Sequence, residues 1–435
     1  MGMKLVAAGD AMLLKDLPFD YELNEISEFI KKGDTRLVNV EMVLSKGKTY
    51  ASSFCGGQWV YSKQSNFDNL QNYGFNLFAC ANNHSMDYSF EGLLEMCDFL
   101  TEKQVKFAGI GKDLQEATKP TYLEVRCKDG VKKVSMISLT TTFIDAARAG
   151  NANSYFPGRP GINPLRHKDI YYVTEDELEI LKTIAKKTCI NGERDNARKI
   201  GSLPPEEKGT FNFGGLFFKK SEIQGKNTIC NEQDLKRILD SIEEAKNNAD
   251  YVIVAAHSHQ IKHEKYTEPD YFFEEFCHKC IDAGASCVIG GGTHQLKPIE
   301  IYKKKPIFYS LGNFIFQLEF VEKLPADFWE KYNFSKDLSI NEAKNLKSKN
   351  GTVGLEMDFS NYLSVIPLIE FDENEVKSIY LKPIELGFEK KGIYKGLPCI
   401  AAKEKCIFIK DYLQEISEKH GTKFNIEKDL IRVVI

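Results

Sequence analysis

The chain has no long apolar run, and this absence excludes one class of protein. Its apolar stretches stay well short of the roughly 20 residues that a membrane-spanning helix needs. The N-terminal segment Met1–Asp10 enters a strand pattern directly, without the apolar core that a signal peptide carries. We therefore expect a cytoplasmic protein with no membrane anchor.

An excess of charge of one sign is also missing. The 58 Lys and Arg residues stand against 62 Asp and Glu residues, which gives a net charge of −4. Because no long basic patch alternates with aromatic residues, a nucleic-acid partner is not indicated. The length of 435 residues allows a large core and roughly two or three domains.

A disulfide framework is the third absence. The 11 cysteines are an odd number and are scattered along the chain, which is typical of reduced thiols. Cys277 and Cys280 have the spacing of half a zinc site, but no second Cys or His pair completes it. They lie within a helical apolar pattern, so we expect burial, with metal binding as the alternative.

The chain does contain polar residues where predicted strands end. The stretch Ala81–Asp87 reads Ala-Asn-Asn-His-Ser-Met-Asp and follows the apolar run Phe75–Ala79, which is typical of a short buried strand. Taken alone, such a stretch is equally typical of a helix cap. It is a candidate site because open α/β sheets carry their active sites at the carboxyl ends of strands.

Other predicted strands end in residues of the same kind. These residues are Asp10 after Lys4–Ala8, Glu41 after Arg36–Val40, His257 after Tyr251–Ala255, and His294 after Cys287–Ile289 and three glycines. With Asn83, they offer the carboxylate, amide and imidazole ligands that manganese, zinc or iron(II) accept. We expect them to meet at one edge and hold one or two divalent ions, with His84 free for proton transfer.

The alternation of strands and helices predicts an α/β fold with one large interruption. Between residues 140 and 229 the rhythm lapses, and we interpret this segment as an insertion that forms a lid or a partner surface. It includes the loop Gly158–His167, whose Arg159 and Arg166 suit an anionic group. A solvated surface loop is the alternative. The Gly-, Ser- and aromatic-rich segment Ser45–Ser62 suits a loop over the site.

The chain changes character after Phe316. The segment Lys331–Lys349 is polar, and the pattern beyond it predicts antiparallel strands followed by an amphipathic helix. The predicted strands are Gly354–Asp358, Ser364–Phe371 and Ser378–Pro383, and the predicted helix is Ala401–His420.

Several of these stretches together resemble one family. They are Gly9–Leu13, Asn39–Glu41, Ala81–Tyr88, Arg159–Arg166, the strand end at His257, and Pro298–Tyr302 with Tyr309–Phe314. In this order, over about residues 3–316, they resemble the CapA family of poly-γ-glutamate capsule biosynthesis proteins, which is similar to the calcineurin-like metallophosphoesterases. The resemblance implies a four-layer α/β/β/α sandwich with two metals over residues 1–316. Residues 317–435 are then an extension that completes the second sheet and adds a terminal helix.

The resemblance also implies roles for single residues. One metal would be held by Asp10, Glu41 and His294, and the other by Glu41, Asn83 and His257. Glu41 would bridge the two, with Asn39 as the alternative for that place. His84 and Asp87 are the implied catalytic residues, His84 as an acid or a charge stabiliser. The implied substrate-binding residues are Arg159, Asn163, Arg166 and Asn313.

The chain departs from the family pattern in two ways. The family usually reads Gly-x-His-Pro-His where this chain has Gly290–His294, so Gly292 stands where the first His is expected. His259 is a candidate replacement, because residues two apart on an extended chain face the same side. Without it, the site would hold one metal or none. Family members are also usually membrane-anchored, and the expected lack of an anchor weakens a direct role in capsule export.

Two functions remain open from the sequence. The favoured one is a metal-dependent hydrolase that acts on a phosphoester or a γ-glutamyl-type amide, a small anionic substrate. The alternative is a non-catalytic binding or assembly factor, because a fold does not fix a function. We favour the enzyme because His84 has no structural need to be where it is.

Overall fold

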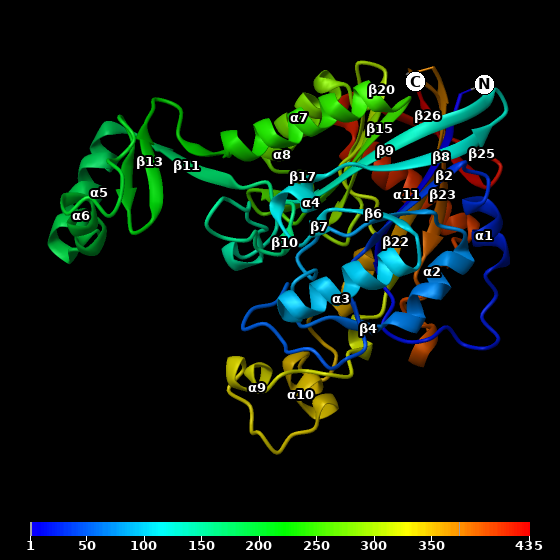
Figure 1. Cartoon of the computed structure of the whole chain (residues 1–435), viewed down its shortest axis with the longest axis horizontal. Coiled ribbons are helices and arrows are strands. Elements are labelled where there is room, and N and C mark those ends of the chain that lie inside the picture. The colour runs from blue at the N-terminus through cyan, green and yellow to red at the C-terminus, as the bar shows by residue number, and fades with distance from the viewer. Residues whose placement is uncertain (1, 374) are drawn as a thin grey trace.

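The computed structural model describes residues 2–373 and 375–435, and it is built on two large β-sheets (Figure 1). Helices and strands alternate along much of the chain, which confirms the predicted α/β class. Within the described residues, no helix combines the length and the apolar character needed to cross a membrane.

The first sheet has ten strands among the described residues. At its centre β1 (Lys4–Met12) runs parallel to β2 (Thr35–Val40), and β5 (Leu77–Ala79) and β6 (Lys106–Ala108) continue the parallel part. The other side of β1 pairs with antiparallel β22 (Leu363–Asp372). The remaining strands are β23 (Glu375–Glu385), β26 (Leu430–Val434), β25 (Lys423–Glu427), β21 (Asn313–Phe316) and β24 (Cys399–Ile400).

The second sheet has six strands in the part of the chain that is described. In spatial order they are β19 (Ile299–Tyr302), β20 (Lys305–Phe308), β18 (Cys287–Gly292), β15 (Tyr251–Ser258), β9 (Gly130–Thr140) and β8 (Thr121–Cys127). Because β15 and β18 are parallel neighbours, their carboxyl ends lie together, with His257 opposite Gly291.

The two sheets pack on each other, and their outer faces are covered by helices. Leu5 and Leu37 of the first sheet share one core with Met136 and Ile253 of the second. The outer face of the first sheet packs against α1 (Asn24–Ile30), α2 (Phe67–Tyr73) and α3 (Ser89–Glu102). The outer face of the second packs against α7 (Glu232–Asn248) and α8 (Tyr271–Ala283). Parallel strands covered on both faces are apolar throughout, as β15 is before its final residues.

Helix α8 contains the paired cysteines, for which the sequence left burial and metal binding open. Cys277 and Cys280 lie on its buried face, in the core that α8 shares with the second sheet. Burial raises the pKa of both thiols well above the ordinary value. The prediction that the pair is buried is confirmed.

Most of the predicted insertion forms a projecting lobe, which we call the arm (residues 167–230). Its four-stranded sheet contains β12 (Phe211–Phe213), β13 (Leu216–Lys220), β11 (His167–Val173) and β14 (Gly225–Cys230), and it carries α5 (Glu175–Thr188) and α6 (Gly192–Lys199). The arm projects away from the two-sheet body (Figure 1). Its strands have few buried positions, which is why the sequence pattern did not reveal them.

The chain beyond Phe316 supplies strands and a small helical lobe. Residues Ser364–Phe371 and Ser378–Pro383 lie in β22 and β23, as predicted, but these strands extend the first sheet, beside β1, and do not complete the second. The predicted strand Gly354–Asp358 is wrong: Gly354 has φ of +119°, and Leu355–Met357 form an exposed 3-10 turn. The predicted C-terminal helix is α11 (Lys403–Ile416). Helices α9 (Asp327–Lys331) and α10 (Ile340–Lys347) form the small lobe.

The remaining strands and helices are short. The strands are β3 (Val43–Ser45), β4 (Tyr61–Lys63), β7 (Ile110–Gly111), β10 (Gly161–Ile162), β16 (Ile261–Lys262) and β17 (Lys265–Pro269). Helix α4 spans Leu114–Thr118. Short 3-10 turns include η3 (Leu318–Phe320), η5 (Phe359–Tyr362) and η7 (Glu418–His420).

Candidate metal centre

Asp10 lies where the two sheets meet, and groups from both sheets bind its carboxylate. From β2, the Asn39 amide Nδ2 donates to Asp10 Oδ1 over 2.7 Å. From β18, the backbone N–H of Gly292 donates to Asp10 Oδ2 over 2.8 Å. Burial alone would raise the pKa of Asp10, but the hydrogen bond and charge of His257, with His294 and Asn39, lower it below the ordinary value. Asp10 is thus held as a buried anion.

Glu41 is the one carboxylate of this cluster without donors. Both of its side-chain oxygens are buried, and no group among the described residues donates a hydrogen bond to either. The imidazole nitrogens closest to it are His257 Nε2, 3.3 Å from Oε1, and His294 Nδ1, 3.9 Å from Oε2. The first distance is short, but the two groups are not oriented as a hydrogen bond. Burial, with the charges of Asp10 and Asp87, raises the pKa of Glu41 well above the ordinary value.

A buried carboxylate without partners is costly, by about 1–3 kcal/mol or more even for one missing bond. Most buried polar atoms in proteins have a partner, and the exceptions need an explanation. A cation placed between Glu41 and the surrounding imidazoles would supply that partner. The two free oxygens of Glu41 therefore fit a metal ion.

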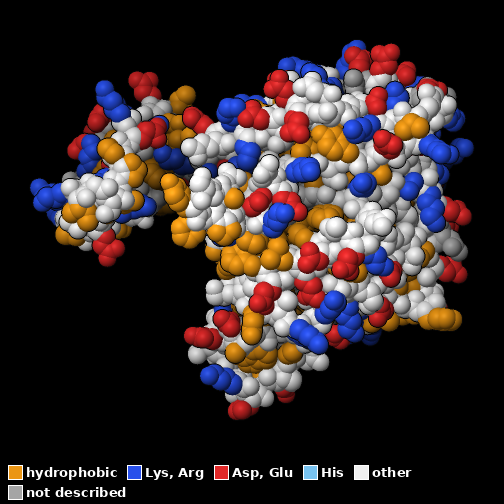
Figure 2. Space-filling model, in the orientation of Figure 1, with side chains coloured by type: hydrophobic (Ala, Val, Ile, Leu, Met, Phe, Trp, Pro, Cys, Tyr) orange, Lys and Arg blue, Asp and Glu red, His pale blue; other side chains and the backbone are white. Residues whose placement is uncertain are grey.

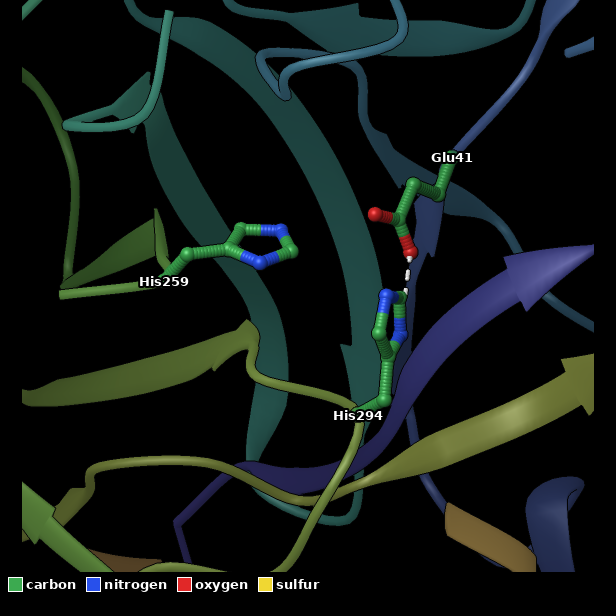
Figure 3. A group of neighbouring side chains, drawn as sticks. All are labelled: Glu41, His259 and His294. Carbon is green, nitrogen blue, oxygen red and sulfur yellow. Dashed lines mark ion pairs between the residues drawn. The ribbon is translucent and has the colours of Figure 1, made fainter. Parts of the chain in front are cut away.

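Three imidazoles surround Glu41. His257 Nε2 lies 2.7 Å from Asn83 Oδ1 and 3.2 Å from His259 Nε2, so it contacts two further potential ligand atoms. His259 and His294 both extend from their strand ends toward Glu41 (Figure 3). Burial, together with His257 and His294, lowers the pKa of His259 well below the ordinary value. A neutral imidazole is the form that binds a metal.

His294 is fixed by a neighbouring amide. Its Nδ1 lies 2.9 Å from Asn313 Oδ1, and Asn313 Nδ2 donates to the carbonyl of Asn361 over 2.9 Å. Because the Asn313 oxygen accepts from Nδ1–H, Nε2 is the nitrogen left to bind a metal, an arrangement common around metal-bound histidines. Burial lowers the pKa of His294 to about 4, although Asp10 and Asn313 oppose the shift. His294 has φ of +62°, a strained backbone of the kind that clusters at functional sites.

The ligand atoms form two groups that share Glu41. One group is Asp10, Glu41 and His257, and the other is Glu41, His259 and His294, with the atoms of each group within 4.8 Å of one another. The resemblance implied a different division, with His294 beside Asp10 and His257 beside Asn83. His294 Nδ1 does lie 3.9 Å from Asp10 Oδ2, so all these side chains belong to one cluster.

Gly292 explains why this chain departs from the usual histidine pair. It has φ of +114°, and a Cβ at this position would lie 2.7 Å from the backbone carbonyl of Ser258. No side chain fits there without moving the end of β15. His259, the candidate replacement, lies near Glu41 and His294, and its backbone N–H donates to Thr142 Oγ1 over 2.8 Å.

His84 and Asp87 form a buried pair beside the cluster. His84 Nδ1 lies 2.7 Å from Asp87 Oδ2. Asp87 also accepts from the backbone N–H groups of Gly56, over 3.0 Å, and Val60, over 2.8 Å. Burial raises the pKa of Asp87, while His84 and these two N–H groups oppose the shift. The segment predicted to lie over the site therefore reaches it and fixes Asp87.

The two asparagines of the Asn-Asn-His motif have different partners. Asn82 Oδ1 accepts from the backbone N–H of His84 over 3.1 Å, and Asn82 Nδ2 donates to the carbonyl of Val40 over 2.8 Å, so Asn82 holds the turn. Asn83 instead faces His257, and its Nδ2 donates to the carbonyl of Gly56 over 2.9 Å. Asn82 thus closes a turn and caps no helix, because α3 begins at Ser89 after Tyr88 without a side-chain cap, whereas Asn83 lies beside His257.

The four predicted substrate-binding residues lie in different surroundings. Arg166 forms a two-bond pair with buried Asp234, at 2.7 and 3.0 Å, so its guanidinium already holds a carboxylate of the chain. Asn163 is buried, and its Nδ2 donates to the carbonyl of Ser138 over 2.9 Å. Asn313 positions His294. Arg159 is exposed, and its Nε donates to the carbonyl of Arg148 over 3.0 Å.

Sequence reasoning missed the residues that act through others. Asp234 binds the guanidinium groups of both Arg166 and Arg237, and Asn361 fixes Asn313 through its backbone carbonyl. Their sequence surroundings do not link them to the predicted site residues, because Arg166 lies 68 positions from Asp234 and Asn313 lies 48 positions from Asn361. Gly292 did carry a signal, since three successive glycines mark a close backbone approach.

Comparison with known proteins shows the family of this chain. Residues 4–318 match the family described as "Bacterial capsule synthesis protein PGA_cap", and the chain belongs to this family. The uncharacterized protein y4sH of Sinorhizobium fredii is 30% identical over 98% of this chain and 92% of its own length. The capsule biosynthesis protein CapA of Bacillus anthracis is 23% identical over 94% of this chain and 74% of its own length. The PGA biosynthesis protein CapA of Bacillus subtilis is 25% identical over 57% of this chain and 44% of its own length.

Proposed function

We propose that this chain is a metal-dependent hydrolase with a metallophosphoesterase-like α/β/β/α arrangement and a metal centre built around Glu41. The observation that carries the proposal is the pair of buried Glu41 oxygens that lack donors and face imidazoles. A carboxylate with two free oxygens suits a bridge between two cations.

The donor set indicates which residues would hold the ions. Asp10, Glu41 and His257 would form one ligand group, with Asn83 beside His257, and Glu41, His259 and His294 would form the other. Carboxylate, amide and imidazole ligands suit manganese, zinc or iron(II). When bound, such ions polarise a phosphoryl or carbonyl oxygen and lower the pKa of a bound water.

The chain's own residues supply the proton transfer. His84 Nδ1 is bonded to Asp87, so Nε2 is the nitrogen that exchanges a proton with the leaving oxygen. Asp87 is held by Gly56 and Val60, so it keeps the imidazole in one orientation and stabilises its protonated form. His84 is thus the catalytic acid, and Asp87 positions it.

The proposed substrate is a small anion that contains a phosphoester or a γ-glutamyl-type amide. Three imidazoles and two cations would give the site a positive field that attracts such a group. Of the two arginines predicted to bind substrate, exposed Arg159 is the better candidate, because Arg166 is paired with Asp234. Lys, Arg, Asp and Glu side chains are mixed over the face shown in Figure 2, which does not favour a polyanionic partner there.

The second candidate function is a non-catalytic binding or assembly factor. The printed names of the Bacillus relatives favour it, because they describe biosynthesis rather than hydrolysis. Such a factor would keep the fold and the metal centre for structural reasons, and it would not need the His84–Asp87 pair.

Hydrolysis of an aryl phosphate with added Mn²⁺ separates the two functions. We expect His84→Ala to lower the rate by about 10²–10⁴-fold, the usual contribution of a general acid. The matched control is His263→Ala, which removes an exposed imidazole outside the cluster. Equal rates for the wild type, His84→Ala and His263→Ala would support the binding factor. A γ-glutamyl anilide assayed in parallel tests the second substrate class.

A further inference from the structure

His259 lies outside the sheet that fixes the neighbouring histidine. His257 belongs to β15, and the flanking strands pair with it at Thr140 of β9 and Gly291 of β18. Strand β15 ends at Ser258, so His259 follows the strand and lacks this support. Its side chain nevertheless extends toward Glu41, as Figure 3 shows. A metal ligand outside a β-ladder needs other contacts to hold its orientation.

Gln260, the next residue, joins this segment to the loop after β9. Its Oε1 accepts from the hydroxyl groups of Thr142 and Ser258, each over 3.1 Å, and from that of Thr141. Its Nε2 donates to the carbonyl of Thr141 over 3.2 Å. Thr142 Oγ1 in turn accepts from the backbone N–H of His259 over 2.8 Å. A single amide therefore fixes the segment that carries His259.

Lys297 binds the same segment from a different part of the chain. It follows His294 by three residues, and its Nζ donates to the backbone carbonyl of Gln260 over 3.0 Å. Its own backbone N–H donates to the carbonyl of Ser310 over 3.2 Å, so its side chain extends from a fixed backbone. One end of this link is next to His259 and the other is close to His294. The link therefore sets how far apart the two histidine segments lie.

A lysine at this position is unfavourable for the fold alone. Lys297 is fully buried, and no carboxylate among the described residues forms an ion pair with it. Burial lowers the pKa of Lys297 to about 7, although Asp270 and Cys277 oppose the shift. A methionine would fill similar space without burying an amine. Either protonation state of the amine donates the bond to Gln260, so the link does not require the charge.

We propose that Gln260 and Lys297 are positioning residues that hold His259 at the separation from His294 that a metal ion requires, a role that rests on the proposed metal centre. The ligand atoms of Glu41, His259 and His294 lie within 4.8 Å of one another. Neither positioning residue belongs to a ligand group, so each acts through His259. Residues that orient metal ligands in this way typically contribute 10- to 100-fold to metal affinity.

The two ligand groups should respond differently to the loss of these supports. Without Lys297 or Gln260, His259 is free to leave the cluster, and the group that contains it weakens. His257 keeps its place, because the β-ladder holds it. We therefore expect one ion to bind as in the wild type and a second ion to bind more weakly.

Titration of metal-free, full-length protein with Mn²⁺ tests the proposal without relying on hydrolysis. Calorimetry measures the number and affinity of the bound ions, and electron paramagnetic resonance distinguishes a coupled pair of ions from a single one. We expect two ions in the wild type, with the spectrum of a coupled pair. Lys297→Met and Gln260→Leu should each weaken the second ion about 10-fold or more and give the spectrum of a single ion.

Two matched controls remove the same kinds of bond elsewhere. Lys305 Nζ donates to the carbonyl of Ala285 over 2.9 Å, at the opposite end of β18 from the metal centre. The two ends of the Gln414 amide bind the backbone of Thr422, over 3.2 Å, and of Phe424, over 3.1 Å. Lys305→Met and Gln414→Leu should bind both ions as the wild type does.

Three results would overturn the proposal and leave the proposed hydrolase unaffected. In the first, the second ion binds equally well to the wild type, Lys297→Met and Gln260→Leu. In the second, these variants lose both ions together. In the third, Lys305→Met weakens the second ion as much as Lys297→Met does. If Lys297→Met does not fold, as judged by circular dichroism, Gln260→Leu at its half-buried position carries the same comparison.

The behaviour of the wild type separates this proposal from the proposed function. A wild type that binds fewer than two ions would overturn the positioning role, and one that binds none would also contradict the metal centre. A wild type that binds two ions but does not hydrolyse the aryl phosphate or the γ-glutamyl anilide would contradict the hydrolase. The weaker second ion in Lys297→Met and Gln260→Leu would then still support the positioning role.

Discussion

Two buried glutamates in this fold, Glu41 and Glu300, lie among histidines but differ in what they bind. Glu300, on β19, accepts from Tyr309 Oη over 2.6 Å and from His278 Nε2 over 3.0 Å, and His420 Nδ1 lies 3.3 Å away. Burial alone would raise its pKa, but His420, Tyr309 and His278 lower it to about 2. Glu41 has no such donors, and its pKa is raised.

The difference in hydrogen-bond donors distinguishes a structural glutamate, Glu300, from the candidate metal ligand, Glu41. Glu300 joins β19 to α8 and to the C-terminal turn η7, so all of its bonds are made within the chain. Glu41 is more deeply buried, at 0% exposure against 9% for Glu300, yet its oxygens have no hydrogen-bond partner among the described residues. A buried acid that the protein itself satisfies stabilises the fold, whereas one left unsatisfied indicates a ligand.

The largest expected effect is on activity. Glu41→Gln should lower Mn²⁺-dependent hydrolysis of an aryl phosphate by about 100-fold or more, because removal of a charged metal ligand weakens the centre and its chemistry. Glu300→Gln, the same change at the other acid, should keep activity within about twofold at a temperature where the protein is folded. Similar losses in both variants would mean that Glu41 acts only through the fold.

The next effect concerns metal binding and stability. Mn²⁺ at 100 times its dissociation constant should raise the free energy of unfolding of the wild type by about 2.7 kcal/mol per site. Thermal melts with and without Mn²⁺ measure this gain. Glu300→Gln should show the same gain, and Glu41→Gln should lose most of it. Stabilisation of Glu41→Gln equal to that of the wild type would place the ion elsewhere.

In metal-free protein the ranking of the two variants should reverse. Glu300→Gln should lower the free energy of unfolding by about 1–3 kcal/mol, because it weakens bonds from three donors to a charged acceptor. Glu41→Gln should be neutral or stabilising, because it removes a buried acid without donors. Urea unfolding of the two proteins in chelator measures the difference. Equal losses would remove the contrast between the two acids.

The smallest effect is a dependence on pH. The folded-state pKa of Glu300, about 2, lies below its ordinary value of 4.5, so its ionised form favours the folded state. That stabilisation is fully present above about pH 4.5 and is lost as the pH falls toward 2. The stability gap between the wild type and Glu300→Gln should therefore narrow over this range. A gap that is constant with pH would show that the Glu300 charge is not responsible.

The sequence predicted the strands of the parallel core well, because each apolar strand and the polar residue at its end are close together in the sequence. Apolar runs ending in Asp10, Asn83, His257 and His294 mark buried strands and the residues at their ends, and the structure brings those ends together. The arm escaped prediction because its short strands, such as Phe211–Phe213, have little buried face and little periodicity. Apolar and polar residues alternate over Gly354–Asp358, but the segment does not form the predicted strand, because it has no neighbouring strand to pair with.

Within the site, residue types were predictable but pairings were not. Asp234 neutralises Arg166 across 68 positions of sequence, and the two Glu41 groups form only when both sheets are in place. The sequence pointed to His259 as a replacement for the histidine that Gly292 displaces, and the structure brings His259 beside Glu41 and His294. That His259 binds a metal in place of the missing histidine stays a prediction.

The most direct test is the metal content of purified protein after loading with Mn²⁺ and removal of free ion, measured for the wild type, Glu41→Gln and Glu300→Gln. We predict bound metal in the wild type and in Glu300→Gln, and little or none in Glu41→Gln. Equal metal content in Glu41→Gln and the wild type, or a wild type that retains no divalent ion, would contradict the claim that Glu41 is kept free for a metal.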